Sequence, residues 1–155
     1  MAVITATFFE CGVRYERQTE AGGQKKVTEL YIVDALSFTE AEERITREMQ
    51  PFVSGTFDVI TIKRTRYSEF INNVPFGDRF YKVKVMYITL DEKTAKPKHT
   101  PVFFLVQASD INTARKVVDD YHKSTVLDYE IVTIDETKYL DVYLHNSQPK
   151  PNESK

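Results

Sequence analysis

The chain carries the segment FDVITIKRTRY at residues 57–67 and the closely similar segment YEIVTIDETKY at residues 129–139. Most positions are identical or exchange like for like, but Lys63-Arg64 in the first segment becomes Asp135-Glu136 in the second. Both segments are rich in the β-branched and aromatic residues that favour strands. The pair therefore predicts two equivalent strands, and it raises the question of why their charges are reversed.

Two further matches follow the same order along the chain. FFECGVRY at 8–15 aligns with FYKVKVMY at 80–87, and YIVDALSFTEA at 31–41 aligns with FLVQASDINTA at 104–114. Colinear matches at a nearly constant spacing are typical of an internal duplication. The alternative is convergent patterning in a chain that is rich in strands.

Local signals divide each half into strand, strand, helix, strand. Gly22 and Gly23 mark the tip of a hairpin between the first two strands. Ser37 and Glu40 form a capping box that predicts the start of a helix, and Asp110 takes the corresponding N-cap position in the second half. The third strand of each half is one of the two similar segments.

These signals predict an α+β fold, in which a β-β-α-β unit is duplicated. We expect two helices packed on a mainly antiparallel sheet, or two such half-sheets packed together. The repeats are predicted at 1–76 and 77–145, as one compact domain with a pseudo-twofold axis, and the polar tail 146–155 is predicted to be disordered. Residues 68–71 and 140–144 are expected to extend the third strands as a further edge.

Three segments carry a resemblance to a known family. ELYIVDALSFTEAEERI at 29–45, TPVFFLVQASDINTA at 100–114 and YEIVTIDETKYLDVY at 129–143 resemble an uncharacterised bacterial and phage-associated family of small duplicated domains of unknown function. The resemblance covers residues 8–144. It implies no activity, cofactor or catalytic residue, and it implies a setting in the mobile-element or phage-linked accessory genome.

The composition is that of a soluble globular protein. The chain has 155 residues, of which 41% are hydrophobic and 28% charged, and a net charge of −2 argues against coating nucleic acid by bulk charge. Cys11 is the only cysteine, which excludes an internal disulfide and fits a reducing compartment. Because no signal peptide or membrane span is recognisable, we predict a cytoplasmic location without membrane contact.

The sequence contains no recognisable catalytic arrangement. Cys11 falls on the apolar side of a predicted strand and is interpreted as a buried hydrophobic residue. His99, His122 and His145 share no ligand spacing, so we interpret them as surface or capping residues rather than zinc ligands. We therefore predict that the protein is not an enzyme and uses no metal or other cofactor.

The first candidate binding feature is the basic strand at 63–67, KRTRY. Lys63, Arg64, Arg66 and Tyr67 combine cations with an aromatic ring, and a strand of this kind can contact phosphates and stack a base. The acidic counterpart in the second half leaves two explanations open. The charges can pair across the pseudo-axis, or one half can be specialised and the other structural.

The second candidate feature is a polar and aromatic strand face that occurs in both halves. Its members, besides Tyr67, are Thr61, Thr65, Thr133, Thr137 and Tyr139. Two equivalent faces can line one symmetric groove for a peptide strand, a nucleic acid or a small ligand. The competing interpretation is ordinary strand propensity on a half-exposed face.

The sequence favours a non-catalytic binding or adaptor module that acts through its sheet face or an edge strand. A protein partner, or self-association with another copy, is the expected mode of interaction. The alternative function is a nucleic-acid-binding accessory protein that uses the basic strand at 63–67. Its binding is expected to weaken with salt and when Arg64 and Arg66 are changed to Ala.

Overall fold

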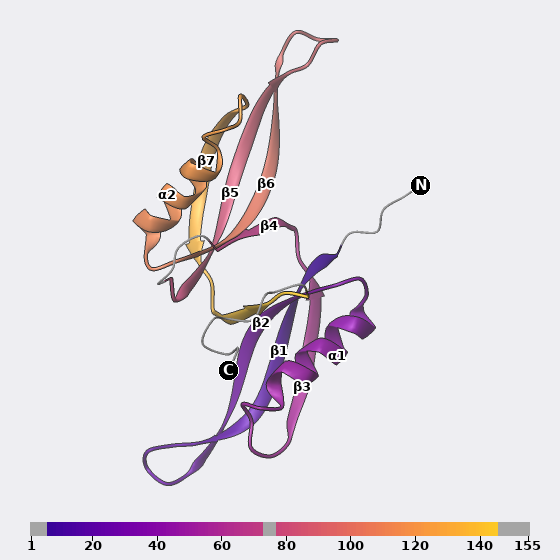
Figure 1. Cartoon of the computed structure of the whole chain (residues 1–155), viewed down its shortest axis with the longest axis vertical. Helices are drawn as coiled ribbons and strands as arrows, with labels where there is room; N and C mark the ends of the chain where they lie inside the picture. Colours follow the sequence, from indigo (N-terminus) through magenta and orange to yellow (C-terminus); the bar gives the residue numbers. More distant parts are fainter. Residues whose placement is uncertain (1–5, 73–76, 146–155) are drawn as a thin grey trace, which may run out of the picture. The chain divides into compact units, whose positions relative to one another are not determined.

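The computed structural model of the chain describes residues 6–72 and 77–145 (Figure 1). These residues form two compact units. Unit 1 comprises residues 6–65 and 139–145, and unit 2 comprises residues 66–72 and 77–138. The predicted tail at 146–155 lies outside the described residues.

Unit 1 is a four-stranded sheet with one helix packed against it. Its elements are β1 (Thr7–Gln18), β2 (Gln24–Ala35), α1 (Phe38–Met49), β3 (Phe57–Arg64) and β8 (Tyr139–Tyr143). The strand order is β3-β1-β2-β8. The β1 strand pairs antiparallel with both β2 and β3, whereas β8 pairs parallel with β2.

Unit 2 has the same architecture, but its strand that corresponds to β8 comes before the other elements in the chain instead of after them. Its elements are β4 (Tyr67–Ile71), β5 (Arg79–Leu90), β6 (Pro97–Ala108), α2 (Ile111–Tyr121) and β7 (Asp128–Glu136). The strand order is β4-β6-β5-β7, with two antiparallel pairings and a parallel pairing between β4 and β6. The α+β class and the two helices are therefore confirmed, and the strands form two sheets.

The predicted helix caps are present. The N–H of Glu40 donates to Ser37 Oγ at 3.1 Å, and Glu40 Oε1 accepts from the N–H of Leu36 at 2.6 Å. In unit 2 the N–H of Thr113 donates to Asp110 Oδ1 at 2.7 Å. Ser37 and Asp110 each satisfy a backbone donor that the first helical turn leaves open, and Glu40 binds the backbone just before the helix.

Alternation along the central strands builds the core of each unit. In unit 1, the alternate residues Phe9, Cys11 and Val13 of β1 pack with the buried face of α1. The same face of β5 packs with α2 in unit 2. Cys11 is fully buried as predicted, and burial raises the pKa of its thiol to about 12. Within the described residues, neither helix has the length and apolar character needed to cross a bilayer.

The last strand of each half is exchanged between the units (Figure 1). A connection of two residues leads from β3 to β4, which joins the sheet of unit 2. A connection of the same length leads from β7 to β8, which joins the sheet of unit 1. At both crossings a threonine fixes the end of the preceding strand, because the N–H and hydroxyl groups of Thr65 and Thr137 donate to the carbonyls of Phe8 and Phe80. The expected extensions at 68–71 and 140–144 thus belong to separate strands.

Candidate functional site

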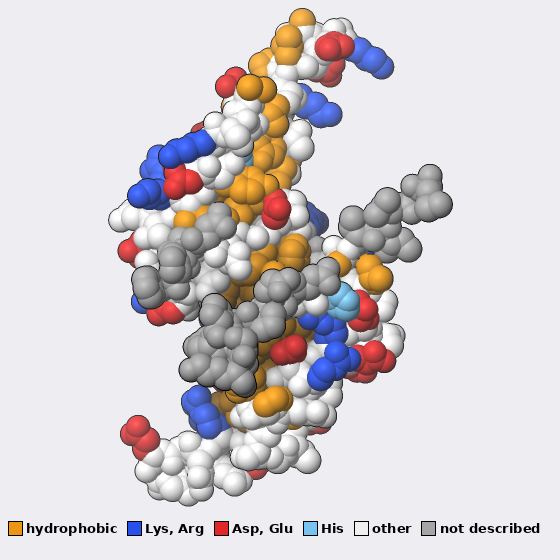
Figure 2. All heavy atoms as spheres, viewed as in Figure 1, with side chains coloured by type: hydrophobic (Ala, Val, Ile, Leu, Met, Phe, Trp, Pro, Cys, Tyr) orange, Lys and Arg blue, Asp and Glu red, His pale blue; other side chains and the backbone are white. Residues whose placement is uncertain are grey.

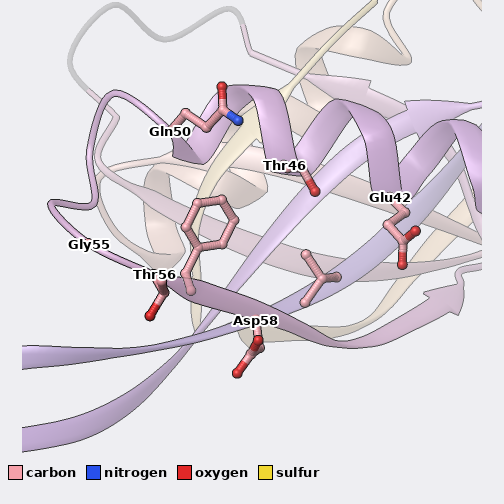
Figure 3. Close-up of a pocket in the computed structure, with 8 residues that line it drawn as sticks. Glu42, Thr46, Gln50, Gly55, Thr56 and Asp58 are labelled. Atoms are coloured by element: carbon pink, nitrogen blue, oxygen red, sulfur yellow. The ribbon is translucent and has the colours of Figure 1, made fainter.

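A groove lies between α1 and β3 in unit 1 (Figure 3). Its volume is about 480 Å³, and it is open to solvent along its length. The lining residues come from the exposed side of the helix and from the start of the strand: Glu42, Thr46, Gln50, Gly55, Thr56, Phe57, Asp58 and Val59. The site therefore combines a polar helix face with an extended backbone.

The helix side of the groove follows from a spacing of four residues. Glu42 and Thr46 stand on successive turns of α1 and Gln50 is its C-cap, and Figure 3 shows their side chains along one side of the helix. Residues four apart lie on the same face of a helix. At the end of the groove, Gly55 has a φ of 117°, a conformation that favours glycine, and it turns the chain from the helix into β3.

The strand side of the groove is a sheet edge. Because β3 is the terminal strand, one of its edges has no strand partner among the described residues. The N–H of Thr65 donates to the carbonyl of Phe8 on β1, and hydrogen-bonding direction alternates along an antiparallel strand. The N–H groups of Ile62 and Arg64 are therefore directed away from β1, on the part of the β3 edge that continues beyond the groove-lining residues 57–59.

The groove contains an unpaired carboxylate. In the part of the chain that the structure describes, Glu42 forms no ion pair. Asp58 lies opposite Arg14 on β1, and its carboxylate points away from α1 (Figure 3). A negative charge on Glu42 therefore faces the open groove, which favours a cationic group there.

The corresponding region of unit 2 is bridged by Tyr129, which aligns with Phe57. The Tyr129 hydroxyl donates to Asp119 Oδ1 on α2 at 2.7 Å, and its ring stacks on His122 with a centroid distance of 4.2 Å. The side chain thus links β7 to α2. The two units consequently differ at this place: a groove in unit 1 and an aromatic bridge in unit 2.

His122 is the centre of that aromatic cluster and is only 4% exposed. Its Nδ1 lies 2.7 Å from the carbonyl of Val118, and its Nε2 lies 2.7 Å from the Tyr87 hydroxyl. Because a carbonyl can only accept, Nδ1 donates and Nε2 accepts from Tyr87. The predicted capping role is confirmed, since His122 is the C-cap of α2, but the residue is buried rather than on the surface.

Both ring nitrogens of His122 are therefore occupied by protein groups, and the cluster has a structural role. The pKa of Tyr87 is raised by burial and by the nearby negative charge of Glu69. In the described ranges 6–72 and 77–145, no three His, Cys, Asp or Glu side chains are arranged to hold a metal ion.

The reversed charges in the two similar segments have partners inside each sheet. Lys63 lies opposite Glu10 in unit 1, whereas Asp135 lies opposite Lys82 in unit 2. Both members of the cross-strand pair are therefore reversed together, which keeps opposite charges next to each other. Neither pairing across a pseudo-axis nor specialisation of one half is needed to explain the reversal at this position. Opposite charges already face each other within each unit.

The next position of the two similar segments, Arg64 in unit 1 and Glu136 in unit 2, also has a neighbour within its own unit. The Arg64 guanidinium lies 5.2 Å from the ring centre of Phe9 and 5.3 Å from that of Phe38, which is a cation–π arrangement. In unit 2, Glu136 lies 3.9 Å from Arg79. The boundary between the units passes between Thr65 and Arg66, so the predicted basic strand is divided between them.

The residues of the predicted polar and aromatic face have several different environments. Thr65 and Thr137 hold strand ends, as described above. Thr61 packs over Gly12, because a Cβ added to that glycine would lie 2.4 Å from Thr61 Oγ1, and Thr133 lies opposite Lys84. The Tyr139 hydroxyl donates to Glu10 Oε1 at 2.9 Å, and Tyr67 begins β4.

The sequence did not indicate the groove as a site. The sequence shows polar residues at 42, 46 and 50, a spacing that places them on one face of a helix. It does not show that the edge strand β3 lies beside this face, and that arrangement forms the groove. His122 was detectable by alignment, since the repeat spacing of 73 places it at the position of the buried core residue Met49.

The fold and the groove define a small α+β protein made of two units, each a four-stranded mixed sheet with one helix. A family model described as "Domain of unknown function (DUF4494)" matches residues 7–145, so the chain belongs to this family. No curated protein matches the chain. The match agrees with the resemblance noted in the sequence to a family of unknown function.

Proposed function

We propose that the protein is a non-catalytic binding module whose unit 1 binds an extended polypeptide segment in the groove between α1 and β3. The observation that carries the proposal is the position of the groove beside an unpartnered strand edge. An added strand takes its main-chain hydrogen bonds from the edge and places alternate side chains in the groove. The β3 edge is eight residues long, enough for a peptide of similar length.

The charge of the groove gives the proposed specificity. Glu42 is placed to receive a Lys or Arg side chain of the bound segment, and Thr46 and Gln50 offer hydrogen-bonding groups on the next two turns. In unit 2, Arg115 aligns with Glu42. The preference for a basic peptide is therefore a property of unit 1 alone.

Nucleic acid is the less favoured ligand. Lys63 lies opposite a carboxylate and Arg64 lies over two aromatic rings, so two cations of the basic strand already have neighbours in unit 1. The net charge of −2 adds no general attraction for phosphates. Binding of nucleic acid in the test below would therefore contradict the proposal.

Internal duplication, a reducing compartment and a phage-linked setting complete the proposed description of the protein. The matching strand orders of the two sheets, β3-β1-β2-β8 and β7-β5-β6-β4, and the colinear sequence matches support an internal duplication. The pseudo-twofold arrangement stays a prediction. The buried free thiol of Cys11 fits a reducing cytoplasm, and the bacterial, phage-linked setting rests on the sequence resemblance. No catalytic step, cofactor or metal is part of the proposed function.

The test uses a library of synthetic peptides of about eight residues whose central residue is Lys, Ala or Glu. Fluorescence anisotropy measures affinity, and amide shifts in NMR spectra locate the site. We expect Lys peptides to bind and to shift resonances of β3 and α1. Glu42→Gln should weaken this binding about tenfold, because a charge-assisted hydrogen bond is lost, and Glu42→Arg should reverse the preference toward Glu peptides.

Arg115→Glu is the matched control, since it alters the same helical position in unit 2 and should leave peptide binding unchanged. The proposal is wrong if no peptide binds in the millimolar range or if the shifts lie outside β3 and α1. Binding of an oligothymidine, with shifts at residues 63–67, would instead support the nucleic-acid alternative.

A further inference from the structure

The outer parts of β5 and β6 extend past β4, and beyond Ile88 they also extend past β7 as a two-stranded ribbon. The two strands pair continuously from Arg79 opposite Ala108 to Leu90 opposite Pro97. Almost all residues from 89 to 101 are exposed, and Leu90 is 67% exposed. A ribbon of this kind has little core of its own, so its surface is available for contacts.

One face of the ribbon is largely apolar. Alternation places it opposite to the face that packs on α2, and cross-strand partners share it. Its members are Met86, Ile88, Leu90, Pro97, His99 and Pro101. In Figure 2, hydrophobic side chains follow β5 and β6 outward to the tip of the ribbon. We call these six residues the ribbon face.

The same face of unit 1 is polar, although the strands and their register are the same. The residues at the corresponding positions are Arg14, Glu16, Gln18, Gln24, Lys26 and Thr28. The fold therefore tolerates polar side chains at every one of these places. The apolar character of the ribbon face is specific to unit 2, and exposed apolar patches of this type mark interaction sites.

Charges of opposite sign lie at the two ends of the ribbon face. The tip has a net positive charge, because Lys93, Lys96 and Lys98 outnumber Asp91 and Glu92. At the inner end, Asp128 and Glu130 of β7 lie opposite Ile88 and Met86, and both carboxylates are exposed.

This distribution is complementary to itself after a half-turn. When two ribbons lie face to face and antiparallel, the apolar residues meet, and the basic tip of each copy reaches the acidic inner end of the other. A twofold interface requires such self-complementarity, because the same patch contributes both sides. The acidic end at Ile88 and the basic tip at Glu92 are four residues apart, roughly 13 Å along a strand. The tip of one copy can therefore reach the acidic end of the other along the length of one ribbon.

We infer that the ribbon face is the surface through which two copies of the chain associate, with their ribbons antiparallel about a twofold axis. The contact area of two ribbons is small, so the dimer is expected to form with a dissociation constant on the order of micromolar. This inference is independent of the peptide groove, which lies in unit 1.

Sedimentation equilibrium of the full chain, across micromolar to millimolar concentrations, tests the inference. We expect a monomer–dimer equilibrium. Leu90→Lys should weaken dimerisation at least tenfold, and so should the double variant Asp128→Lys with Glu130→Lys. Gln18→Lys, at the position of Leu90 in unit 1, is the control and should leave dimerisation unchanged. Circular dichroism confirms that each variant is folded.

Charge exchange gives the decisive measurement. Adding Lys93→Glu and Lys96→Glu to the double variant should restore dimerisation, because opposite charges again meet across the axis. A monomer at all concentrations, or a dimer insensitive to Leu90→Lys, would overturn the inference. So would a dimer that both the double and the quadruple variants weaken equally. Co-sedimentation of monomer with neutral phosphatidylcholine vesicles, lost in Leu90→Lys, would assign the ribbon face to a lipid surface instead.

Discussion

The guanidinium of Arg44 lies 2.5 Å from the carboxylate of Asp34, and both side chains are largely buried in unit 1. The N–H of His145 donates to the same carboxylate. With the repeat spacing of 73, the corresponding positions in unit 2 hold Val117 and Gln107. One fold thus accommodates either an ion pair or a neutral pair at the same two positions.

Arg44→Val is therefore expected to destabilise the protein by about 3 kcal/mol, because it leaves a buried carboxylate without its cation. The double variant Arg44→Val with Asp34→Gln copies unit 2 and should recover most of that loss. Urea unfolding followed by circular dichroism measures both. A double variant no more stable than the single one would show that the ion pair is not interchangeable with the neutral pair.

The cross-strand charge pair of unit 2 should show measurable coupling. Asp135→Lys places two lysines opposite each other, whereas Asp135→Lys with Lys82→Glu reproduces the arrangement of unit 1. Lys82 also contacts the Phe103 ring, so its single substitution has a separate cost. We expect a favourable coupling energy of about 0.5 kcal/mol in the double-mutant cycle. Additive effects of the two substitutions would contradict the pairing.

His122→Met tests the aromatic cluster, since Met49 occupies the corresponding position in unit 1. The substitution keeps the volume but removes the acceptor of the Tyr87 hydroxyl, and a cost of about 1 kcal/mol is expected. Adding Tyr87→Phe removes the unpaired hydroxyl and should return part of that stability. If the second substitution lowers the melting temperature further, the hydrogen bond is not the main contribution of His122.

Alkaline pH should unfold the protein through its buried tyrosines. Burial raises the pKa of Tyr143 to about 12, and burial followed by the negative charge of Glu29 raises the pKa of Tyr31 as well. Since the tyrosinate is favoured in the unfolded chain, this stability is complete below about pH 10 and decreases as the pH rises toward 12. Absorbance at 295 nm and circular dichroism should change together, with a higher midpoint in Tyr143→Phe. Separate titration and unfolding would contradict this assignment.

Much of the local structure was predictable because its determinants are close in sequence. The caps at Ser37 and Asp110, the hairpin tip at Gly22 and the burial of Cys11 depend on residues within a few positions or on simple alternation. The third strands were predictable from the same alternation. These features need no knowledge of which distant segment lies alongside.

The exchanged strands were not predictable in the same way. The crossings from β3 to β4 and from β7 to β8 take two residues each, and such a connector looks the same whether the next strand stays in its own sheet or leaves it. The parallel pairings of β4 and β8 depend on distant partners. The groove depends on the resulting strand order, because that order leaves β3 at an edge.

The exchange has a consequence for the order in which the protein is made. Unit 1 begins near the N-terminus, but its sheet needs β8, whose last residue is Tyr143. At ribosomal rates of roughly 5–20 residues per second, several seconds separate the synthesis of β3 from that of β8. During this interval the nascent chain presents an open β2 edge, to which a strand from a neighbouring nascent chain can add.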